Sequence, residues 1–524
     1  MQFVMGFANL ADQLQAIPLS TLLVGASITW LLYVSGLAVS RLYLSPLAKF
    51  PGPKLAAFTK WYEFYYEVVR RGQYQFLIND MHKKYGPIVR VTPFELHVDE
   101  STFWDTLYSK HPKAHKYSWM NGRFGNESSI FTTCDPVLHR ARRAPLNSMF
   151  SRRAIVGQEP IVQERIGAIC HKIAGYQKEE RVIKLQYMWS AYACDVVTTY
   201  AFGYNNDQVG SEDFEDNLHK EFLALSEFGH LALQFPWIPP IMEMLPEKVS
   251  AAMNPELGKL FRLQSDLRYT IARIRSEQDI AEKQPTEPTI FHEMLKSNLS
   301  EEDKSDKRLG HEAQAVIGAG LSTTAWALSV ACFYVLNDPS VLAKLRRELF
   351  TAIPHINAPD AFAFSKTEPL EYLRGVVREG IRLSHGVTSR MPRIVSHPLQ
   401  FQDWTIPPWT PVSMTIMDVH FDPEIYPEPH MFKPERWMGN PKAPDGNSLE
   451  HYWVGFGKGT RMCLGMQLAV MEMVIGLAHF FRRFEFELYD TDESDVELKH
   501  DFTIPAPRMD SKGVRVRVKG VEEK

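Results

Sequence analysis

Phe456-Gly457-Lys458-Gly459-Thr460-Arg461-Met462-Cys463-Leu464-Gly465 places a single cysteine behind a glycine-rich loop that carries an arginine. The apolar stretch that follows predicts a helix that begins near Cys463 and runs to Phe481. The positive end of that helix dipole favours the thiolate, the form of cysteine that ligates metals. The loop glycines let the backbone approach a flat ring closely. The run therefore predicts a haem-thiolate site, with Arg461 paired to a carboxylate on the edge of the ring.

Two other interpretations of the loop are weaker. A single cysteine is more often a buried structural residue, but the spacing of the whole run argues against this. A phosphate-binding loop is excluded because no Gly-Lys-Ser/Thr follows at the required offset. The ten residues together resemble the cysteine-loop signature of the cytochrome P450 family. That resemblance implies haem b as the cofactor, Cys463 as the axial iron ligand, and Phe456, Gly457 and Arg461 as haem contacts.

Two further segments carry paired charges. Glu379-Gly380-Ile381-Arg382 puts a carboxylate and a guanidinium on one helix face, as many surface helices do. Pro434-Glu435-Arg436-Trp437 follows some way downstream. The two segments resemble the Glu-x-x-Arg and Pro-Glu-Arg elements of the family. The resemblance implies that Glu379, Arg382 and Arg436 form a buried structural charge network behind the cysteine loop.

A long helix is predicted over about Gly310–Leu336, ending before Pro339, and Ala313–Asn337 carries no charge. A second membrane span is the competing interpretation, but its glycines, serines and threonines favour a core helix that a ligand approaches closely. Ala319-Gly320-Leu321-Ser322-Thr323-Thr324 resembles the oxygen-activation motif of the family, with Ser322 where an acid is usual. The alternative is that these hydroxyls only bond back to carbonyls one turn earlier. We expect protons to travel through Thr323, Ser322 and ordered water.

Cationic partners for the haem propionates are predicted at four positions, which are His139, Arg143, Arg393 and Arg461. His139 occupies the place that a tryptophan usually holds in the family, and its ring can still donate a hydrogen bond. Arg140 and Arg142 belong to the same basic cluster, which is either a docking site for an acidic electron donor or a solvated helix face. By resemblance, the substrate pocket is predicted to include Phe124, Ala315, Ala319, Val387, Thr388 and Ile504.

Composition bounds the class of protein. The chain has 524 residues, 45% of them hydrophobic, and a net charge of −4, which argues against nucleic acid as a partner. Five cysteines without a Cys-x-x-Cys pair indicate neither a disulfide framework nor a zinc site. Helical periodicity dominates, and short alternating runs such as Ile88–Val91 predict small sheets. We therefore expect a mainly α fold with small β-sheets, which by resemblance is the cytochrome P450 fold.

The N-terminal region is predicted to be a membrane anchor, since Pro18–Val39 is largely apolar and long enough to cross a bilayer. A cleaved signal peptide is the alternative, but no basic residue precedes the span. Arg41, Lys49 and Lys54 follow it and favour a cytosolic C-terminal part. The predicted division is an anchor at 1–40, a basic, proline-rich hinge at 41–60 and one catalytic domain at 61–524. The expected location is the endoplasmic reticulum membrane, with a single pass.

The resemblance implies a monooxygenase that inserts one oxygen atom from O₂ into an apolar small molecule. No dinucleotide-binding fingerprint is found, so electrons are expected from NADPH through a separate cytochrome P450 reductase, with cytochrome b5 as a further partner. The chain looks most like microsomal members from filamentous fungi, which implies a terpenoid or polyketide intermediate of secondary metabolism as substrate. Two alternatives stay open. One is a haem-thiolate isomerase or dehydratase that needs neither O₂ nor reductase, and the other is a non-catalytic haem-binding protein.

Overall fold

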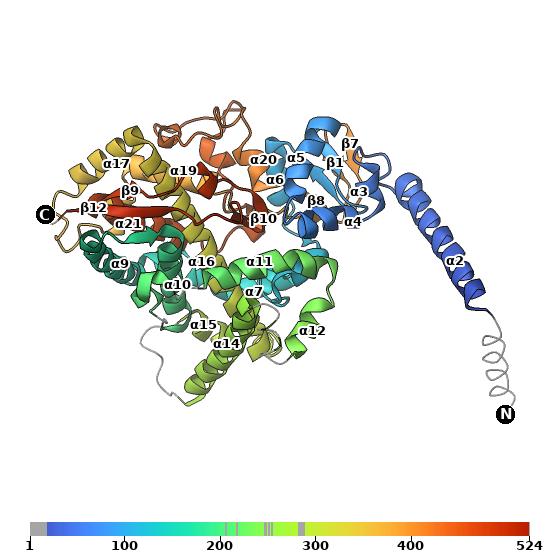
Figure 1. Ribbon diagram of the computed structural model, residues 1–524, viewed down its shortest axis with the longest axis horizontal. Helices are drawn as coiled ribbons and strands as arrows, with labels where there is room; N and C mark the ends of the chain where they lie inside the picture. Colours follow the sequence, from blue (N-terminus) through green and yellow to red (C-terminus); the bar gives the residue numbers. More distant parts are fainter. Residues whose placement is uncertain are drawn as a thin grey trace.

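The computed structural model describes residues 18–204, 207–215, 218–245, 249, 252, 255–280 and 289–522. Helices form most of the globular body, and the N-terminal helix projects away from it (Figure 1). The described helices are α2 (Leu19–Val39), α3 (Lys54–Phe58), α4 (Trp61–Phe64), α5 (Tyr74–Tyr85), α6 (Trp104–Tyr108), α7 (Pro136–Met149), α8 (Arg152–Val156), α9 (Glu159–Glu179), α10 (Leu185–Phe202), α11 (His219–Gln234), α12 (Ile238–Met244), α14 (Pro255–Ile280), α15 (Ile290–Lys296), α16 (Asp306–Asn337), α17 (Pro339–Ala352), α18 (Phe364–Thr367), α19 (Glu371–Leu383), α20 (Ile416–His420) and α21 (Met466–Arg483).

Twelve short strands form four small sheets in the described part of the chain. They are β1 (Ile88–Arg90), β2 (Leu96–Val98), β3 (His115–Lys116), β4 (Val182–Lys184), β5 (Arg393–Ile394), β6 (Leu399–Phe401), β7 (Trp404–Ile406), β8 (Val412–Ser413), β9 (Phe484–Leu488), β10 (His500–Phe502), β11 (Ile504–Ala506) and β12 (Arg515–Val521). The largest sheet has the order β1-β2-β8-β5-β3, and β4-β12-β9 forms a second. The remaining two are the hairpins β10-β11 and β6-β7. The mainly α fold with small sheets is thus confirmed.

Helix α16 runs through the centre of the body and is the main scaffold of the helical core. Ser305 caps its start, because the Ser305 hydroxyl accepts a hydrogen bond from the Arg308 N–H, so the helix begins earlier than predicted. Close packing requires a glycine on this helix, since a Cβ at Gly318 would lie 2.3 Å from the Phe222 ring of α11. Its most apolar window is 78% buried inside the protein. This helix is therefore a core helix and not a second membrane span.

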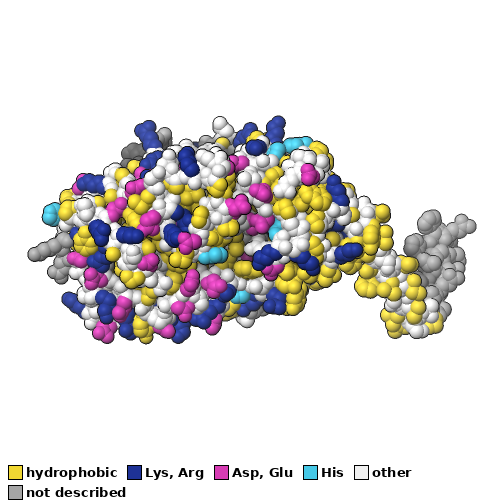
Figure 2. Space-filling model, turned by 90° about the horizontal axis from the view of Figure 1, so that it is seen from above, with side chains coloured by type: hydrophobic (Ala, Val, Ile, Leu, Met, Phe, Trp, Pro, Cys, Tyr) yellow, Lys and Arg dark blue, Asp and Glu magenta, His cyan; other side chains and the backbone are white. Residues whose placement is uncertain are grey.

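The N-terminal helix differs, because none of its apolar window is buried. One further turn, η1 (Ser40–Leu44), extends α2, and together they are long and apolar enough to cross a membrane. Figure 2 shows hydrophobic side chains over this projecting helix, whereas charges of both signs spread over the body. The predicted hinge packs on the body, with Leu47 and Phe50 buried. Residues 1–17 of the predicted anchor lie outside the described residues.

The cysteine loop lies where two hydrophobic cores meet. One core is built from the central helices, and Phe456 and Leu464 pack against it. The other core lies around the largest sheet and includes Tyr452 and Val454. Because the loop touches both cores, its position depends on how the helical and sheet parts of the body pack together.

Candidate active site

The cysteine loop is held in shape by its own backbone. The Cys463 N–H donates to the Phe456 carbonyl at 2.8 Å, which closes the loop. Gly457 and Gly459 adopt φ angles of 66° and 71°, which favour glycine. A Cβ at Gly459 would also lie 2.2 Å from the Tyr108 carbonyl oxygen. Helix α21 begins at Met466, just after the cysteine, so the predicted arrangement of loop, cysteine and helix is present.

The Cys463 thiol is accessible to solvent although protein surrounds it on most sides. Burial raises the pKa of this thiol, while the backbone N–H groups of Gly465 and Met466 and the charge of Arg143 act in the opposite direction. Those N–H groups lie at the start of α21, where the helix dipole is positive. The protein thus prepares the sulfur for negative charge without creating a free thiolate, as a site that gains a metal cation requires.

Four cations converge near the cysteine, and sequence analysis missed one of them. Lys116 and Arg393 are register partners on strands β3 and β5, so like charges lie directly opposite each other. Arg461 donates to the Thr133 and Cys134 carbonyls at 2.5 and 3.0 Å. Arg143 donates to the Asn147 side chain at 3.1 Å. Within the described residues, none of the four forms an ion pair with a carboxylate.

The pKa values of these cations show the lack of compensating charge. Burial lowers the pKa of Lys116 well below its usual range, and Arg393 and Arg461 lower it further. Burial, followed by Arg393, lowers the pKa of Arg461 to about 10. Arg393 is buried and the other three cations are half-buried, and a partly buried cluster of one sign is unfavourable unless an anion joins it. The two propionates of haem supply such an anion, so the residues present fit this cofactor.

His139 lies on α7 next to the cation cluster and is buried. Burial, and then the charge of Arg461, lowers its pKa to about 3. The imidazole is therefore neutral at physiological pH and can donate one hydrogen bond, as predicted for a partner of a propionate. It adds a donor to the cluster without adding another charge.

A second charged cluster lies behind the loop and contains both signs of charge, with one carboxylate and two guanidinium groups; we call it balanced because its carboxylate is fully hydrogen-bonded. Arg382 forms two hydrogen bonds to the Glu379 carboxylate, at 2.9 and 2.7 Å, and Arg436 donates to the same group at 2.8 Å. The Trp437 indole N–H donates to Glu379 at 2.9 Å. Glu379 and Arg382 are both fully buried. The structure thus brings together the three residues of the predicted network, with Trp437 as an additional member.

His420 connects this network to the cysteine loop, which sequence analysis missed. Its Nδ1 lies 3.2 Å from the Arg382 carbonyl oxygen, and its Nε2 accepts a hydrogen bond from the Val454 N–H at 3.0 Å. These contacts place the proton on Nδ1. Burial, and then Arg382, lowers the pKa of His420 to about 3, so the ring stays neutral. The network therefore positions the chain just before Phe456 through a histidine.

Helix α16 presents different residues on its two sides. Ala319 and Thr323 are exposed and Ala315 is half-buried, although most of the helix is buried, so a row of small residues borders an open space. Thr323 donates to the Ala319 carbonyl at 2.7 Å. Ser322 is buried instead, and its hydroxyl has no partner among the described residues. It lines a separate cavity of about 200 Å³ between α10, α11 and the segment after β11. The structure does not place Ser322 and Thr323 on the same face.

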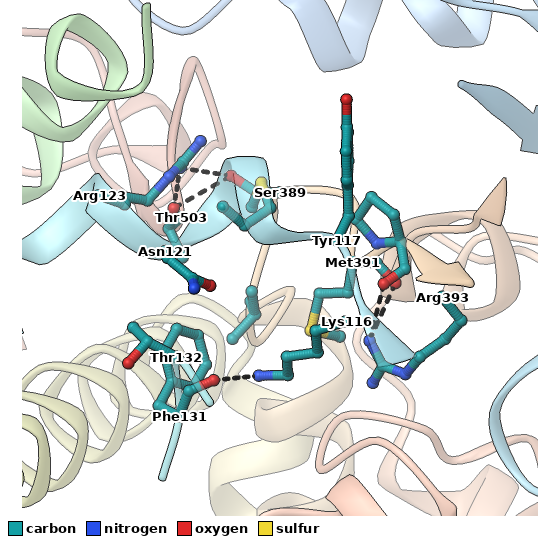
Figure 3. A pocket seen from close by; sticks show the side chains of 13 residues that line it. Lys116, Tyr117, Asn121, Arg123, Phe131, Thr132, Ser389, Met391, Arg393 and Thr503 are labelled. Atoms are coloured by element: carbon teal, nitrogen blue, oxygen red, sulfur yellow. Dashed lines mark hydrogen bonds between the residues drawn. The ribbon is translucent and has the colours of Figure 1, made fainter. Parts of the chain in front are cut away.

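The predicted pocket residues do not all line one space. Val387 lines a first cavity, of about 30 Å³, shown in Figure 3. Ile504 lines the second, larger cavity together with Ser322. Thr388 is buried and donates to the Asp501 carboxylate at 2.6 Å. Phe124 packs against the helical core, and its ring lies 6.1 Å from that of Phe131. Their role in substrate binding stays a prediction.

Comparisons with known proteins agree with this geometry. The sequence model of the family described as Cytochrome P450 matches residues 51–512. Cytochrome P450 monooxygenase sdnE from Sordaria araneosa is 49% identical, over 96% of this chain and 99% of its own length. Tryptophan 6-hydroxylase fscE from Fusarium equiseti is 41% identical, over 92% of this chain and 94% of its own. N-acetyltryptophan 6-hydroxylase ivoC from Emericella nidulans is 38% identical, over 93% and 95%. With the cysteine loop and its cations in place, the chain belongs to the cytochrome P450 family and is a monooxygenase of that family.

Proposed function

We propose that this protein is a membrane-anchored haem-thiolate enzyme that inserts one oxygen atom from O₂ into a largely apolar small molecule. The observation that carries the proposal is the accessible Cys463 thiol at the start of α21, facing a cluster of cations that lacks a carboxylate. Cys463 would ligate the iron, and Lys116, Arg143, Arg393, Arg461 and His139 would hold the propionates. Bound haem with a thiolate ligand supplies O₂ activation and O–O cleavage.

The protein's own part is to position the substrate and to move protons. Small side chains at Ala315 and Ala319 leave room for a flat ring and a substrate along one face of α16. Thr323, on the same face, can pass a proton from its hydroxyl. Ser322 lines the second cavity, so it would act from a different face of the helix, through water in that cavity.

The substrate class rests on resemblance. A terpenoid or polyketide intermediate of secondary metabolism remains our first choice. Two relatives named above carry tryptophan and N-acetyltryptophan in their names, so indole compounds belong in the same panel of candidates.

Electrons are proposed to come from NADPH through a reductase in the endoplasmic reticulum membrane, with cytochrome b5 as a second donor. The exposed apolar helix α2 supports anchoring there. Arg140 is exposed on α7 and available for docking. Arg142 instead pairs with Asp303 at 2.7 Å, so its charge is already engaged inside the protein. We expect raised salt to slow reduction of the iron.

The test is mass spectrometry of products from membranes that contain this protein and a reductase, with isotopically labelled O₂. Terpenoid, polyketide and indole compounds are offered with and without NADPH, beside Cys463→Ala and the control Cys170→Ala, a cysteine that contacts His479 away from the loop. A product that gains one labelled oxygen and needs both NADPH and Cys463 supports the proposal. A Cys463-dependent product of unchanged mass without NADPH would support the isomerase or dehydratase instead.

Thr323→Ala tests the proton route. We expect the product rate to fall by up to about 100-fold, with NADPH consumption diverted to peroxide, because general acid catalysis is lost. Product and peroxide are measured in the same reaction. Unchanged values for both would exclude a role for Thr323, and Ser322→Ala run in parallel shows whether that different face of the helix contributes.

A further inference from the structure

The first cavity is lined by positive charge only. Its charged side chains are Lys116, Arg123 and Arg393, and no aspartate or glutamate of the described part of the chain lines it. Lys116 and Arg393 lie at one end, beside the other cations of the haem site, whereas Arg123 lies at the opposite end (Figure 3). The cavity has a volume of about 30 Å³, enough for one or two waters or for a single carboxylate group.

Arg123 is fixed in place but not paired with a carboxylate. It lies in the turn η4 (Ser118–Phe124) and is only 3% exposed. A Cβ at Gly229 of α11 would lie 2.6 Å from Arg123 Cγ, so that helix packs directly on the arginine stem. Arg123 Nη1 donates to the hydroxyls of Ser389, at 2.9 Å, and Thr503. Arg123 Nε has no partner among the described residues.

The two hydroxyls beside Arg123 already form other hydrogen bonds, because Ser389 and Thr503 also bond to each other at 3.1 Å. Ser389 donates to the Asp501 carboxylate at 2.8 Å, and the same carboxylate accepts from the Thr503 N–H at 2.8 Å. Asp501 forms no hydrogen bond with Arg123 among the described residues; the Ser389 hydroxyl links the two, and the Asp501 charge acts on Arg123 from a distance. Burial still lowers the pKa of Arg123, although Asp501 and Glu67 oppose this effect. The guanidinium thus keeps donor capacity for a further acceptor.

Two more observations indicate a ligand at this end. The Asn121 oxygen accepts from the Cys134 thiol at 3.1 Å, so its amide N–H₂ remains as a donor, and Figure 3 shows the amide directed into the cavity. Thr503 adopts a φ of 71°, a strained conformation for a β-branched residue, at the tip of the β10-β11 hairpin. Such strain persists mainly at sites where the geometry serves binding.

We propose that the Arg123 end of this cavity binds a carboxylate of the substrate, so that the enzyme selects a molecule that is apolar except for one acid group. Val387 and Met391 form an apolar wall of the same cavity, which suits the rest of such a molecule. This inference rests on the proposed function, and it adds a substrate class. A haem propionate is the other carboxylate within reach, and the experiment separates the two.

The test is calorimetric titration of the purified, haem-loaded full-length protein, without NADPH or reductase. The probes are abietic acid and indole-3-butyric acid, each beside its methyl ester. We expect the acids to bind about 10- to 100-fold more tightly than the esters, as for hydrogen bonds to a charged group. Arg123→Gln should remove that preference, whereas the exposed Arg153→Gln keeps it. Because no turnover is needed, the result stands whether or not the monooxygenase reaction is correct.

A second variant tests the proposal independently of whether Arg123→Gln folds. Asn121→Asp leaves Arg123 in place but adds a negative charge to the cavity, so acids should bind more weakly while esters bind as before. Equal affinity of acids and esters for the unmodified protein, no binding of either acid, or a preference that survives Arg123→Gln would each overturn the proposal. Loss of haem from Arg123→Gln together with no acid preference would assign Arg123 to a haem propionate.

Discussion

Two charged clusters lie around the cysteine loop, and they differ in whether they contain both signs of charge. The cluster of Glu379, Arg382 and Arg436 contains both signs, and its carboxylate is fully hydrogen-bonded. The cluster of Lys116, Arg143, Arg393 and Arg461 contains one sign, and its members donate mostly to backbone carbonyls. A balanced buried cluster is complete within the protein, whereas an unbalanced one requires a ligand. The comparison therefore distinguishes charges that are paired within the protein from charges that we propose to bind the cofactor.

The largest effect is expected in the balanced cluster. Arg382→Ala leaves the Glu379 carboxylate buried with one cation fewer, which should cost about 3–5 kcal/mol of folding free energy. We expect apoprotein or no folded protein, measured by haem content and thermal unfolding. Arg374→Ala, an exposed arginine of the same helix, is the control and should change stability by about 0.5 kcal/mol or less. Stable haem incorporation in the Arg382 variant would show that the network is not needed to hold the loop.

A substitution in the unbalanced cluster should have the opposite effect on the stability of the apoprotein. Lys116→Gln removes a buried charge that faces Arg393, so apoprotein stability should stay constant or rise. Haem affinity should fall about 10-fold or more, because a charge-assisted hydrogen bond to a propionate is lost. Haem titration of the apoprotein and its chemical unfolding measure the two quantities. A destabilised apoprotein with unchanged haem affinity would place Lys116 with the structural charges.

The smallest effect concerns pH and the histidine that joins the network to the loop. The pKa of His420 is about 3 in the folded protein, below the ordinary value near 6.5 of the unfolded chain. Between these values the unfolded state binds more protons, so stability rises with pH through this window and falls as pH drops below about 6.5. The slope contributed by one such residue is up to about 1.4 kcal/mol per pH unit.

His420→Gln should reduce this slope, because glutamine does not titrate and can still bond the Arg382 and Val454 backbone. Unfolding free energies at a series of pH values from 7 down to about 5 provide the measurement. His171→Gln, at an exposed histidine, is the matched control for this substitution. Identical slopes for the two variants would mean that His420 does not stay neutral in the folded protein.

Several features of the site were predictable because they are local. The glycines, the cysteine and the start of the following helix lie within or directly after ten consecutive residues. The Glu379–Arg382 pair follows from helical spacing. The core helix was predicted from its length, its composition and the proline that ends it. Its earlier start depends on the Ser305 cap, which the apolar pattern did not reveal.

Other features depend on partners that are distant in the sequence. Lys116 lies among the other cations only because β3 pairs with β5, and nothing near Lys116 in the chain indicates this register. His420 acquired its role from backbone groups of Arg382 and Val454. Ser322 and Thr323 are neighbours in the sequence, but adjacent helical residues are rotated by about 100°, so Ser322 lines the second cavity whereas Thr323 lies on an exposed face.

The sequence by itself determined the family, the cysteine loop and the apolar N-terminal helix, because motif spacing and hydropathy act over short stretches of chain. Only the tertiary structure decided which cations surround the cysteine and which charges already have partners. It also decided that Arg123 lines a cavity and that its Nε has no hydrogen-bond partner among the described residues. The physical reason is that charge balance and burial are properties of a three-dimensional neighbourhood. Lys116 faces Arg393 across a strand pair, and Arg123 contacts Thr503, 380 residues away in the sequence.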